Sequence, residues 1–223
     1  MARDRPDPRT ARWSELTGAA KGSTYDARWA QLAAEGRSVH GEADLVGDLM
    51  VEGDRSFAPP PTVLDAGCGT GRIAIELDAR GMDVVGVDRD ADLLATARAK
   101  APELRWVEAD LVDVGRFVEV RSVQAAVLAG NVMIFVDAGT EAAVVAAVAG
   151  TLVPDGLLVT GFQVRPDGYG PDRFDQDAAA AGLHLVDRWA TWDRQPWSEG
   201  GDYQVSVHIL RTGLRVVGAA PEG

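Results

Sequence analysis

From residue 62 onward, short apolar runs alternate with segments in which apolar residues recur at helical spacing. The first run, 63–66, ends in a glycine-rich stretch, and the next segment, 71–80, places Ile73 and Leu77 on one helical face. A strand–helix rhythm of this kind predicts a mostly parallel sheet with helices on both faces. The further elements expected in this part are strands at 83–87, 104–108, 123–128 and 157–162 and helices at 90–100 and 141–152.

The last part of the chain departs from that rhythm. After a helical pattern at 172–181, two strand-like runs, 183–192 and 203–211, are joined only by residues 193–202. A parallel crossover normally needs a dozen or more residues and a helix, so this pair is expected to form an antiparallel hairpin at the sheet edge. The pattern as a whole predicts an α/β fold, a three-layer sandwich around a seven-stranded, mostly parallel sheet.

Two helical patterns precede the first strand. Residues 25–35 place Trp29 and Leu32 on one face, and the apolar positions of residues 45–50 indicate a second helix. Three consecutive prolines, 59–61, then separate helix from strand. Neither helix buries enough to fold alone. Residues 1–61 are therefore expected to form an N-terminal helical cap and linker, and residues 62–223 the α/β domain.

The charge balance restricts the partners of the chain. Its net charge is −12, which repels a phosphate backbone whose binding depends on Lys and Arg, so no nucleic acid is expected. The single cysteine and three scattered histidines offer no metal-ligand spacing, so no metal is expected either. Residues 1–12 lack an apolar signal core, and no apolar stretch approaches the ~20 residues of a membrane span. These features predict a cytoplasmic protein without membrane contact.

The turn after the first strand carries the strongest chemical signal. Residues 65–71 read DAGCGTG, with Gly67, Gly69 and Gly71 behind an aspartate. Ligands of an open α/β sheet bind beyond the carboxyl ends of the strands, where glycine lets the backbone approach them closely. The dinucleotide fingerprint needs glycine where Arg72 stands, and no Lys-Ser/Thr pair of a P-loop follows. The pattern D-x-G-x-G-x-G resembles motif I of the class I S-adenosylmethionine-dependent methyltransferases.

This resemblance implies S-adenosylmethionine as the cofactor and gives roles to acids at three consecutive strand ends. Asp65 helps to hold the amino group of the cofactor. Asp88, which ends the 83–87 run, binds both ribose hydroxyls, a task that suits a two-pronged acceptor. At the end of the third strand, Asp110 accepts the adenine amino hydrogen and the backbone amide of Leu111 meets a ring nitrogen.

The same resemblance assigns the remaining positions. Gly130 and Asn131, after the fourth strand, lie beside the methionine portion of the cofactor, and this loop lacks the Pro-Pro stretch of amino-directed DNA methyltransferases. Cys68 packs or offers its backbone in the glycine turn rather than attacking a base. Arg89 and Tyr25 complete the expected cofactor set. The residues expected on the acceptor side lie in the cap and in loops at the same sheet edge: Trp29, Met133, Phe135, Tyr169 and Trp197.

Together these features predict a methyltransferase that passes the methyl group in line to a small-molecule acceptor. The sulfonium is already activated, which leaves the protein to position the acceptor and exclude water. No catalytic residue is identified, because His40, His184 and His208 all favour structural or surface roles. Two alternatives stay open: a non-catalytic S-adenosylmethionine-binding regulatory protein and, against the glycine spacing and the missing Tyr-x-x-x-Lys, an NAD(P)-dependent oxidoreductase.

Overall fold

The structure is a computed structural model, and it describes residues 22–36, 39–52, 60–166 and 168–211. Within these residues, seven strands form one sheet in the order β3-β2-β1-β4-β5-β7-β6. The strands are β1 Thr62–Ala66, β2 Asp83–Asp88, β3 Arg105–Glu108, β4 Val123–Leu128, β5 Leu152–Gln163, β6 Leu183–Trp189 and β7 Tyr203–Leu210.

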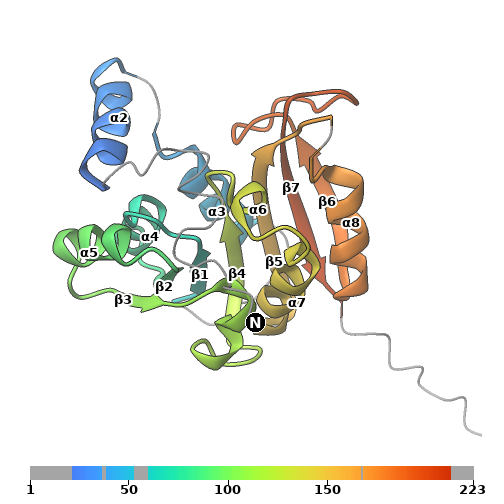
Figure 1. Cartoon of the computed structure of the whole chain (residues 1–223), viewed down its shortest axis with the longest axis horizontal. Coiled ribbons are helices and arrows are strands. Elements are labelled where there is room, and N and C mark those ends of the chain that lie inside the picture. The colour runs from blue at the N-terminus through green and yellow to red at the C-terminus, as the bar shows by residue number, and fades with distance from the viewer. Residues whose placement is uncertain (1–21, 37–38, 53–59, 167, 212–223) are drawn as a thin grey trace, which may run out of the picture.

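Strands β1 to β5 pair in parallel, and β7 lies antiparallel between β5 and β6. The seven-stranded, mostly parallel α/β sheet and its C-terminal antiparallel hairpin are thereby confirmed. Since β1, β2, β4 and β5 run in the same direction, their carboxyl ends share one edge of the sheet (Figure 1). The loops that follow these strands can therefore build one site.

Helices cover both faces of the sheet (Figure 1). One face packs against α7 and α8 through buried side chains such as Val148 and Phe174, and the other packs against α3 and α4 through side chains such as Leu45 and Leu77. The helical elements are α2 Gly22–Ala34, α3 Gly41–Val51, α4 Arg72–Ala79, α5 Ala91–Lys100, η2 Leu111–Arg116, α6 Val132–Phe135, α7 Glu141–Thr151 and α8 Pro171–Ala180.

Several element ends differ from the sequence prediction, each for a local reason. Strand β5 begins at Leu152 rather than residue 157, because Leu152 pairs with Val123 and residues 153–156 of β5 then form an irregularity before Leu157 pairs with Ala125. Strand β6 ends at Trp189 rather than residue 192, because the chain then turns and the N–H of Ala190 donates to the carbonyl of Gln195. The short helices η2 and α6 were not predicted, since they are too short to show apolar periodicity.

The helices before the sheet are attached in different ways. Helix α3 buries Leu45, Val46 and Leu49 against the same core as α4, whereas α2 lies near α5 at the outer side of the fold (Figure 1). The assignment of residues 1–61 as cap and linker stays a prediction. Among the described residues, no helix is long and apolar enough to cross a bilayer.

Candidate cofactor-binding site

The turn between β1 and α4 has left-handed backbone at three alternate residues. Gly67, Gly69 and Gly71 have φ angles of +83°, +55° and +79°. Glycine adopts this conformation without the steric cost that a Cβ atom brings. The turn is attached to β2, since the N–H groups of Gly67 and Cys68 both donate to the carbonyl of Val87, at 2.7 and 3.0 Å. The sequence pattern therefore corresponds to a tight backbone turn at the carboxyl ends of β1 and β2.

The surroundings of the three glycines differ. A Cβ atom at Gly67 would collide with Val132, and one at Gly71 would collide with the ring of Trp106, so these two glycines make room for other parts of the protein. At Gly69 a Cβ atom would meet only a leucine methyl at 3.9 Å, an ordinary contact distance. Gly69 is therefore the position at which the missing side chain leaves open space beside the turn.

Asp88, at the end of β2, directs its carboxylate back toward this turn. Its Oδ2 accepts the N–H of Gly69 at 2.8 Å, and its Oδ1 accepts the N–H of Asp90 at 2.9 Å. Burial raises the pKa of Asp88 above its ordinary value, and the two amide hydrogen bonds oppose that rise. A carboxylate has about four acceptor positions, so two more hydrogen bonds are available. This arrangement suits a pair of neighbouring hydroxyl groups beside Gly69.

Asp65 lies deeper, beneath the turn. The residue is 1% exposed, and its Oδ2 accepts the N–H of Ala74, in the first turn of α4, at 3.0 Å. Burial raises the pKa of Asp65 to about 7, although the Ala74 hydrogen bond and the nearby charge of Arg72 act in the opposite direction. Its Oδ1 accepts no hydrogen bond from the part of the chain that the structure describes. A cationic group at this point would favour the ionised carboxylate.

The acid after β3 is held by two contacts. Asp110 caps η2, with Oδ1 accepting the N–H of Val112 at 3.1 Å, and its Oδ2 lies 3.3 Å from the guanidinium of Arg89. Arg89 also lies 3.5 Å from Asp137, so it links the end of β2 to the end of β3 and to the loop before α7. Leu111 is buried in the core. The predicted residues Arg89, Asp110 and Leu111 are thus brought together at this edge of the sheet.

The loop after β4 is rigidly placed. Gly130 and Asn131 have φ angles of +69° and +72°, and the Oδ1 atom of Asn131 accepts the N–H of Gln163 at 2.8 Å. The N–H of Asn131 also donates to the carbonyl of Gly161, at 3.4 Å. The side chain of Asn131 therefore joins the ends of β4 and β5. Gly130 beside it is exposed, and the contact of both residues with a cofactor stays a prediction.

The residues expected on the acceptor side lie mostly in the core. Met133 is fully buried and Phe135 packs against the same core. Tyr169 is 5% exposed, and its hydroxyl donates to Asp177 at 2.6 Å beneath α8. Trp197 lies 5.4 Å from the guanidinium of Arg188, measured to the ring centroid. Met133, Phe135 and Tyr169 pack in one core cluster, and the contact of all four side chains with an acceptor stays a prediction.

Helix α2 is attached directly to the glycine turn. Asp26 accepts a hydrogen bond from the hydroxyl of Thr70, at 2.6 Å, and lies 3.0 Å from the ammonium group of Lys100 at the end of α5. Thr70 stands between Gly69 and Gly71, so the helix is fastened to the turn itself. Tyr25 precedes Asp26 in α2, but its side chain lies outside the described residues, and its role stays a prediction.

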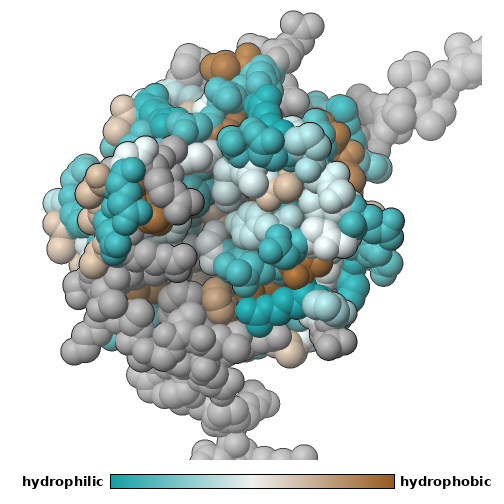
Figure 2. Space-filling model, turned by 90° about the horizontal axis from the view of Figure 1, so that it is seen from above, coloured by the Kyte–Doolittle hydropathy of each residue, from teal (hydrophilic) through white to brown (hydrophobic). Residues whose placement is uncertain are grey.

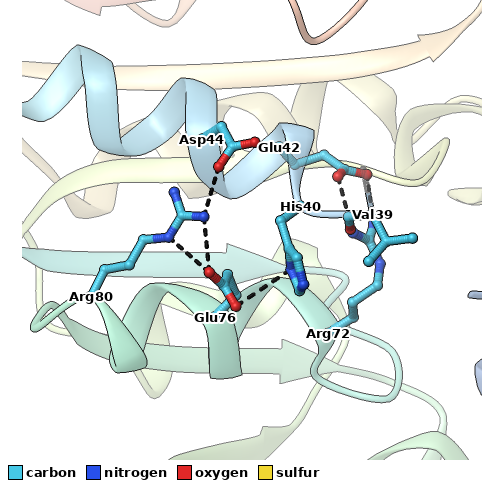
Figure 3. Close-up of polar contacts among 7 residues, drawn as sticks. All are labelled: Val39, His40, Glu42, Asp44, Arg72, Glu76 and Arg80. Carbon is cyan, nitrogen blue, oxygen red and sulfur yellow. Dashed lines mark hydrogen bonds and ion pairs between the residues drawn. The ribbon is translucent and has the colours of Figure 1, made fainter. Parts of the chain in front are cut away.

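A second attachment centres on Arg72, the first residue of α4 (Figure 3). Its guanidinium binds both carboxylate oxygens of Glu42 in α3, donates to the carbonyl of Val39, and lies 3.8 Å from the ring centroid of Trp29. A more exposed set of ion pairs lies beside it, in which Arg80 contacts Asp44 and Glu76, and Glu76 contacts His40. The segment before β1 is thereby connected to α4 at two places.

Sequence reasoning missed several of these residues. Asp26, Glu42 and Arg72 gave no signal, because their partners lie far away in the sequence. Trp106, whose ring lies against Gly71 and Gly86 and whose Nε1 donates to the carbonyl of Ala101 at 2.7 Å, was also missed. Trp106 lies far from both glycines along the chain, so the sequence does not show that its ring packs against them.

Comparison with known proteins agrees with this geometry. Residues 63–156 match the family model of a methyltransferase domain. A TehB-like S-adenosylmethionine-dependent methyltransferase from Corynebacterium glutamicum is 34% identical, with a TM-score of 0.74 over 85% of this chain and 98% of that chain. An amino pentose methyltransferase from Micromonospora echinaspora, solved with S-adenosylmethionine bound, is 22% identical, with a TM-score of 0.63 over 83% of this chain and 96% of its own.

Shorter stretches match curated methyltransferases. A segment of 52 residues, 22% of this chain and 21% of the relative, is 44% identical to trans-aconitate 2-methyltransferase from Azoarcus sp. (strain BH72). The matched stretches span only 16–21% of the length of such relatives. The fold and the 34% identity over 85% of this chain place it in one family: it belongs to the class I S-adenosylmethionine-dependent methyltransferases. Its cofactor is S-adenosylmethionine.

Proposed function

We propose that this protein transfers the methyl group of S-adenosylmethionine to a small-molecule acceptor by direct in-line displacement, as a methyltransferase of the cytoplasm. One observation carries the proposal. The carboxylate of Asp88 is fastened to the N–H of Gly69, the one glycine of the turn that faces open space. A nucleoside whose ribose hydroxyls meet Asp88 fits this arrangement, because no side chain of the turn stands in its way.

The cofactor supplies an activated methyl group, and the chain's own residues bind and orient it. Asp65 Oδ1 accepts from the cationic amino group, Asp88 accepts from the ribose, and Asp110 accepts from the adenine amino group beside the Leu111 amide. The backbone from Gly67 to Gly71, including Cys68, and the backbone of Gly130 and Asn131 form the floor. Arg89 holds Asp110 in place through the contact at 3.3 Å.

The acceptor is proposed to be small for two reasons. Structural relatives include an amino pentose methyltransferase and a 1,6-didemethyltoxoflavin N1-methyltransferase, both named for small acceptors. The net charge of −12 opposes a phosphate backbone, and among the residues coloured in Figure 2 the hydrophobic side chains form only small separate patches. A metabolite that enters beside the cap therefore fits better than a nucleic acid or a lipid surface.

No general base is identified for the reaction: an amine acceptor would need none, whereas a hydroxyl acceptor would benefit from one. Among the described residues, His40 contacts Glu76, His184 is exposed on β6, and His208 is buried beneath α8. None of these imidazoles lies at the glycine turn. The protein contributes mainly by placing the acceptor in line with the methyl group and by excluding water.

A calorimetric titration tests the cofactor site with a matched pair of glycine variants. Gly69 and Gly81 both have left-handed backbone, and neither Cβ atom would meet a close neighbour, so alanine should cost each about 1–2 kcal/mol of stability. Only Gly69→Ala should weaken binding of S-adenosylhomocysteine, by tenfold or more, because its methyl group enters the proposed site. Equal affinity of the two variants would remove the site from this turn.

Two further measurements separate the alternatives. Binding of S-adenosylhomocysteine together with no response to NAD supports the methyltransferase, and the reverse result supports the oxidoreductase. Incubation with labelled S-adenosylmethionine and a metabolite extract should then give labelled product. Tight cofactor binding without any labelled product would instead support a regulatory binding protein.

A further inference from the structure

Four buried polar side chains gather on the sheet face that α8 covers, away from the glycine turn. Thr160 on β5 and Gln204, Ser206 and His208 on β7 are all between 0% and 1% exposed. They lie within an apolar cluster that includes Phe162, Leu158 and Phe174. Polar groups this deep normally have hydrogen-bond partners.

The strand register places the four side chains next to one another. Thr160 lies directly opposite Ser206, Phe162 opposite Gln204, and Leu158 opposite His208. Residues two apart on a strand share a face, so the two hydroxyl groups occupy the centre, with the amide on one side and the imidazole on the other. Phe174 of α8 covers the set, with its ring 5.1 Å from the His208 ring and 5.7 Å from the Phe162 ring.

One end of each long side chain is already bound. The Oε1 atom of Gln204 accepts from Arg188 at 3.0 Å, and the Nε2 atom of His208 lies 3.1 Å from Asp175. Arg188 in turn lies 2.6 Å from Asp175. Partial burial would raise the pKa of Asp175, but the hydrogen bonds from His208 and Arg188 outweigh it and lower the pKa. Asp175 is therefore ionised and only accepts, so Nε2 of His208 carries the proton.

The inward ends have no partner. Thr160 Oγ1, Ser206 Oγ, Gln204 Nε2 and His208 Nδ1 are buried and make no hydrogen bond to any residue that the structure describes. Their polarity is matched: Gln204 Nε2 can only donate, His208 Nδ1 accepts when Nε2 carries the single ring proton, and each hydroxyl can do both. A chain of hydrogen bonds can thus run from the Gln204 amide, through the two hydroxyl groups, to the His208 ring if a small molecule bridges these groups.

We propose that these four groups surround an internal hydration site that holds at least one ordered water molecule. Water donates and accepts, as the matched ends require, and buried waters typically make two to four hydrogen bonds to such groups. An anion is disfavoured, because the nearby guanidinium of Arg188 is already paired with Asp175. A metal cation is disfavoured, because the amide nitrogen of Gln204 offers no lone pair to it.

The hydration site connects β5, β7 and α8 behind the cofactor edge. Thr160 precedes Gly161, whose carbonyl accepts from Asn131 in the loop after β4. The hydration site therefore lies between the strand that supports this loop and its neighbour β7, whose register is set by backbone pairing. It is separate from the proposed function, and its absence would leave the cofactor site as described.

Water-oxygen magnetic relaxation dispersion on the full chain tests the proposal by counting long-lived internal waters. The double variant Thr160→Val/Ser206→Ala should lose at least one. Thr151→Val is the matched control, because Thr151 is equally buried but its hydroxyl already donates to the carbonyl of Val148 at 2.7 Å. The control should keep the wild-type count. An unchanged count in a folded double variant would overturn the proposal.

A high-resolution crystal structure of the wild-type chain decides the question even if the double variant fails to fold. Density for a water within hydrogen-bond distance of at least two of the four atoms would support the site. Direct hydrogen bonds among the four side chains, with no water between them, would overturn it. Nitrogen NMR of His208 is a third test, because it shows which ring nitrogen carries the proton. We expect a proton on Nε2 and an accepting Nδ1. A proton on Nδ1 at neutral pH would contradict the chain of hydrogen bonds from Gln204 to His208.

Discussion

Two arginine–carboxylate pairs, one on each side of the sheet, have the same chemistry but different surroundings. Arg72 pairs with Glu42 on the cofactor side, and Arg188 pairs with Asp175 beneath α8; each arginine side chain is 12% exposed. Arg72 joins segments far apart in the sequence and ends in contacts to Val39 and Trp29. Arg188 instead leads inward, through Gln204, to atoms that have no partner in the part of the chain that the structure describes.

The same ion-pair chemistry therefore performs two different tasks in the two places. On the cofactor side it fastens the segment before β1 to the start of α4, at the residue that follows the glycine turn. On the α8 side it orients polar groups inside the fold.

Removal of Glu42 should show how much its ion pair with Arg72 contributes to the free energy of unfolding. Glu42→Ala leaves a largely buried guanidinium without its carboxylate, so the free energy of unfolding should fall by about 3–5 kcal/mol. Asp44→Ala is the control, since Asp44 lies on the same helix with a side chain 54% exposed and should cost less than about 1 kcal/mol. Urea unfolding measures both. Similar losses for the two variants would mean that the Arg72 contact does not fasten this segment.

Removal of the ribose acceptor should affect binding more than folding. Asp88→Ala deletes the charge-assisted hydrogen bonds to the proposed ribose, so S-adenosylhomocysteine should bind about 1.5–3 kcal/mol more weakly by calorimetry. Asp92→Ala, in the exposed first turn of α5, should leave the affinity unchanged. If Asp88→Ala bound as tightly as the wild type, the ribose would lie elsewhere.

Asp65, which is buried, and Asp175, which is partly buried, should give opposite pH dependences. Burial raises the pKa of Asp65 to about 7, so between about pH 4 and 7 the folded protein binds more protons than the unfolded chain. The stability of the unliganded protein from this group is therefore present at the acid end and is lost as pH rises through 7. Asp175 behaves in the opposite way: its lowered pKa gives stability above its ordinary pKa, which is lost as pH falls through the folded value.

Cofactor affinity should depend on pH, because the pKa of Asp65 is raised. Because the carboxylate must ionise to hold a cationic amino group, S-adenosylhomocysteine should bind about tenfold more tightly per pH unit up to 7 and then level off. Calorimetry from pH 5.5 to 8, in the wild type and in Asp65→Asn, measures the slope. A slope that persists in the variant would assign the proton to another group.

Much of the fold was predictable because its signals are local. The parallel strands appear as apolar runs, and the hairpin follows from the short connection between residues 192 and 203. The glycine turn and the acid positions at 65, 88 and 110 were also visible, since each stands at the end of a strand in the right order. Local patterning fixes where such residues lie along the chain, and the sheet order then brings them to one edge.

The remainder depends on contacts that no local pattern contains. Glu42 and Arg72 meet only after α3 packs on α4, and Thr160 meets Ser206 only through the antiparallel register of β5 and β7. The side chain of Asn131 looked available to a ligand, but it is used to join two strand ends. Tertiary packing decides how such polar groups are used, and the sequence alone shows only that they are present.

The reversed direction of β7 has a practical consequence for handling the protein. Tyr203 lies opposite Gln163 at the cofactor edge, so the strand runs away from that edge and Leu210 lies near the far one. A surface-immobilisation tag attached after this strand would leave the sheet on the side remote from the glycine turn. An attachment before α2 would instead start from a helix that contacts Thr70, so biosensor measurements should use the former arrangement.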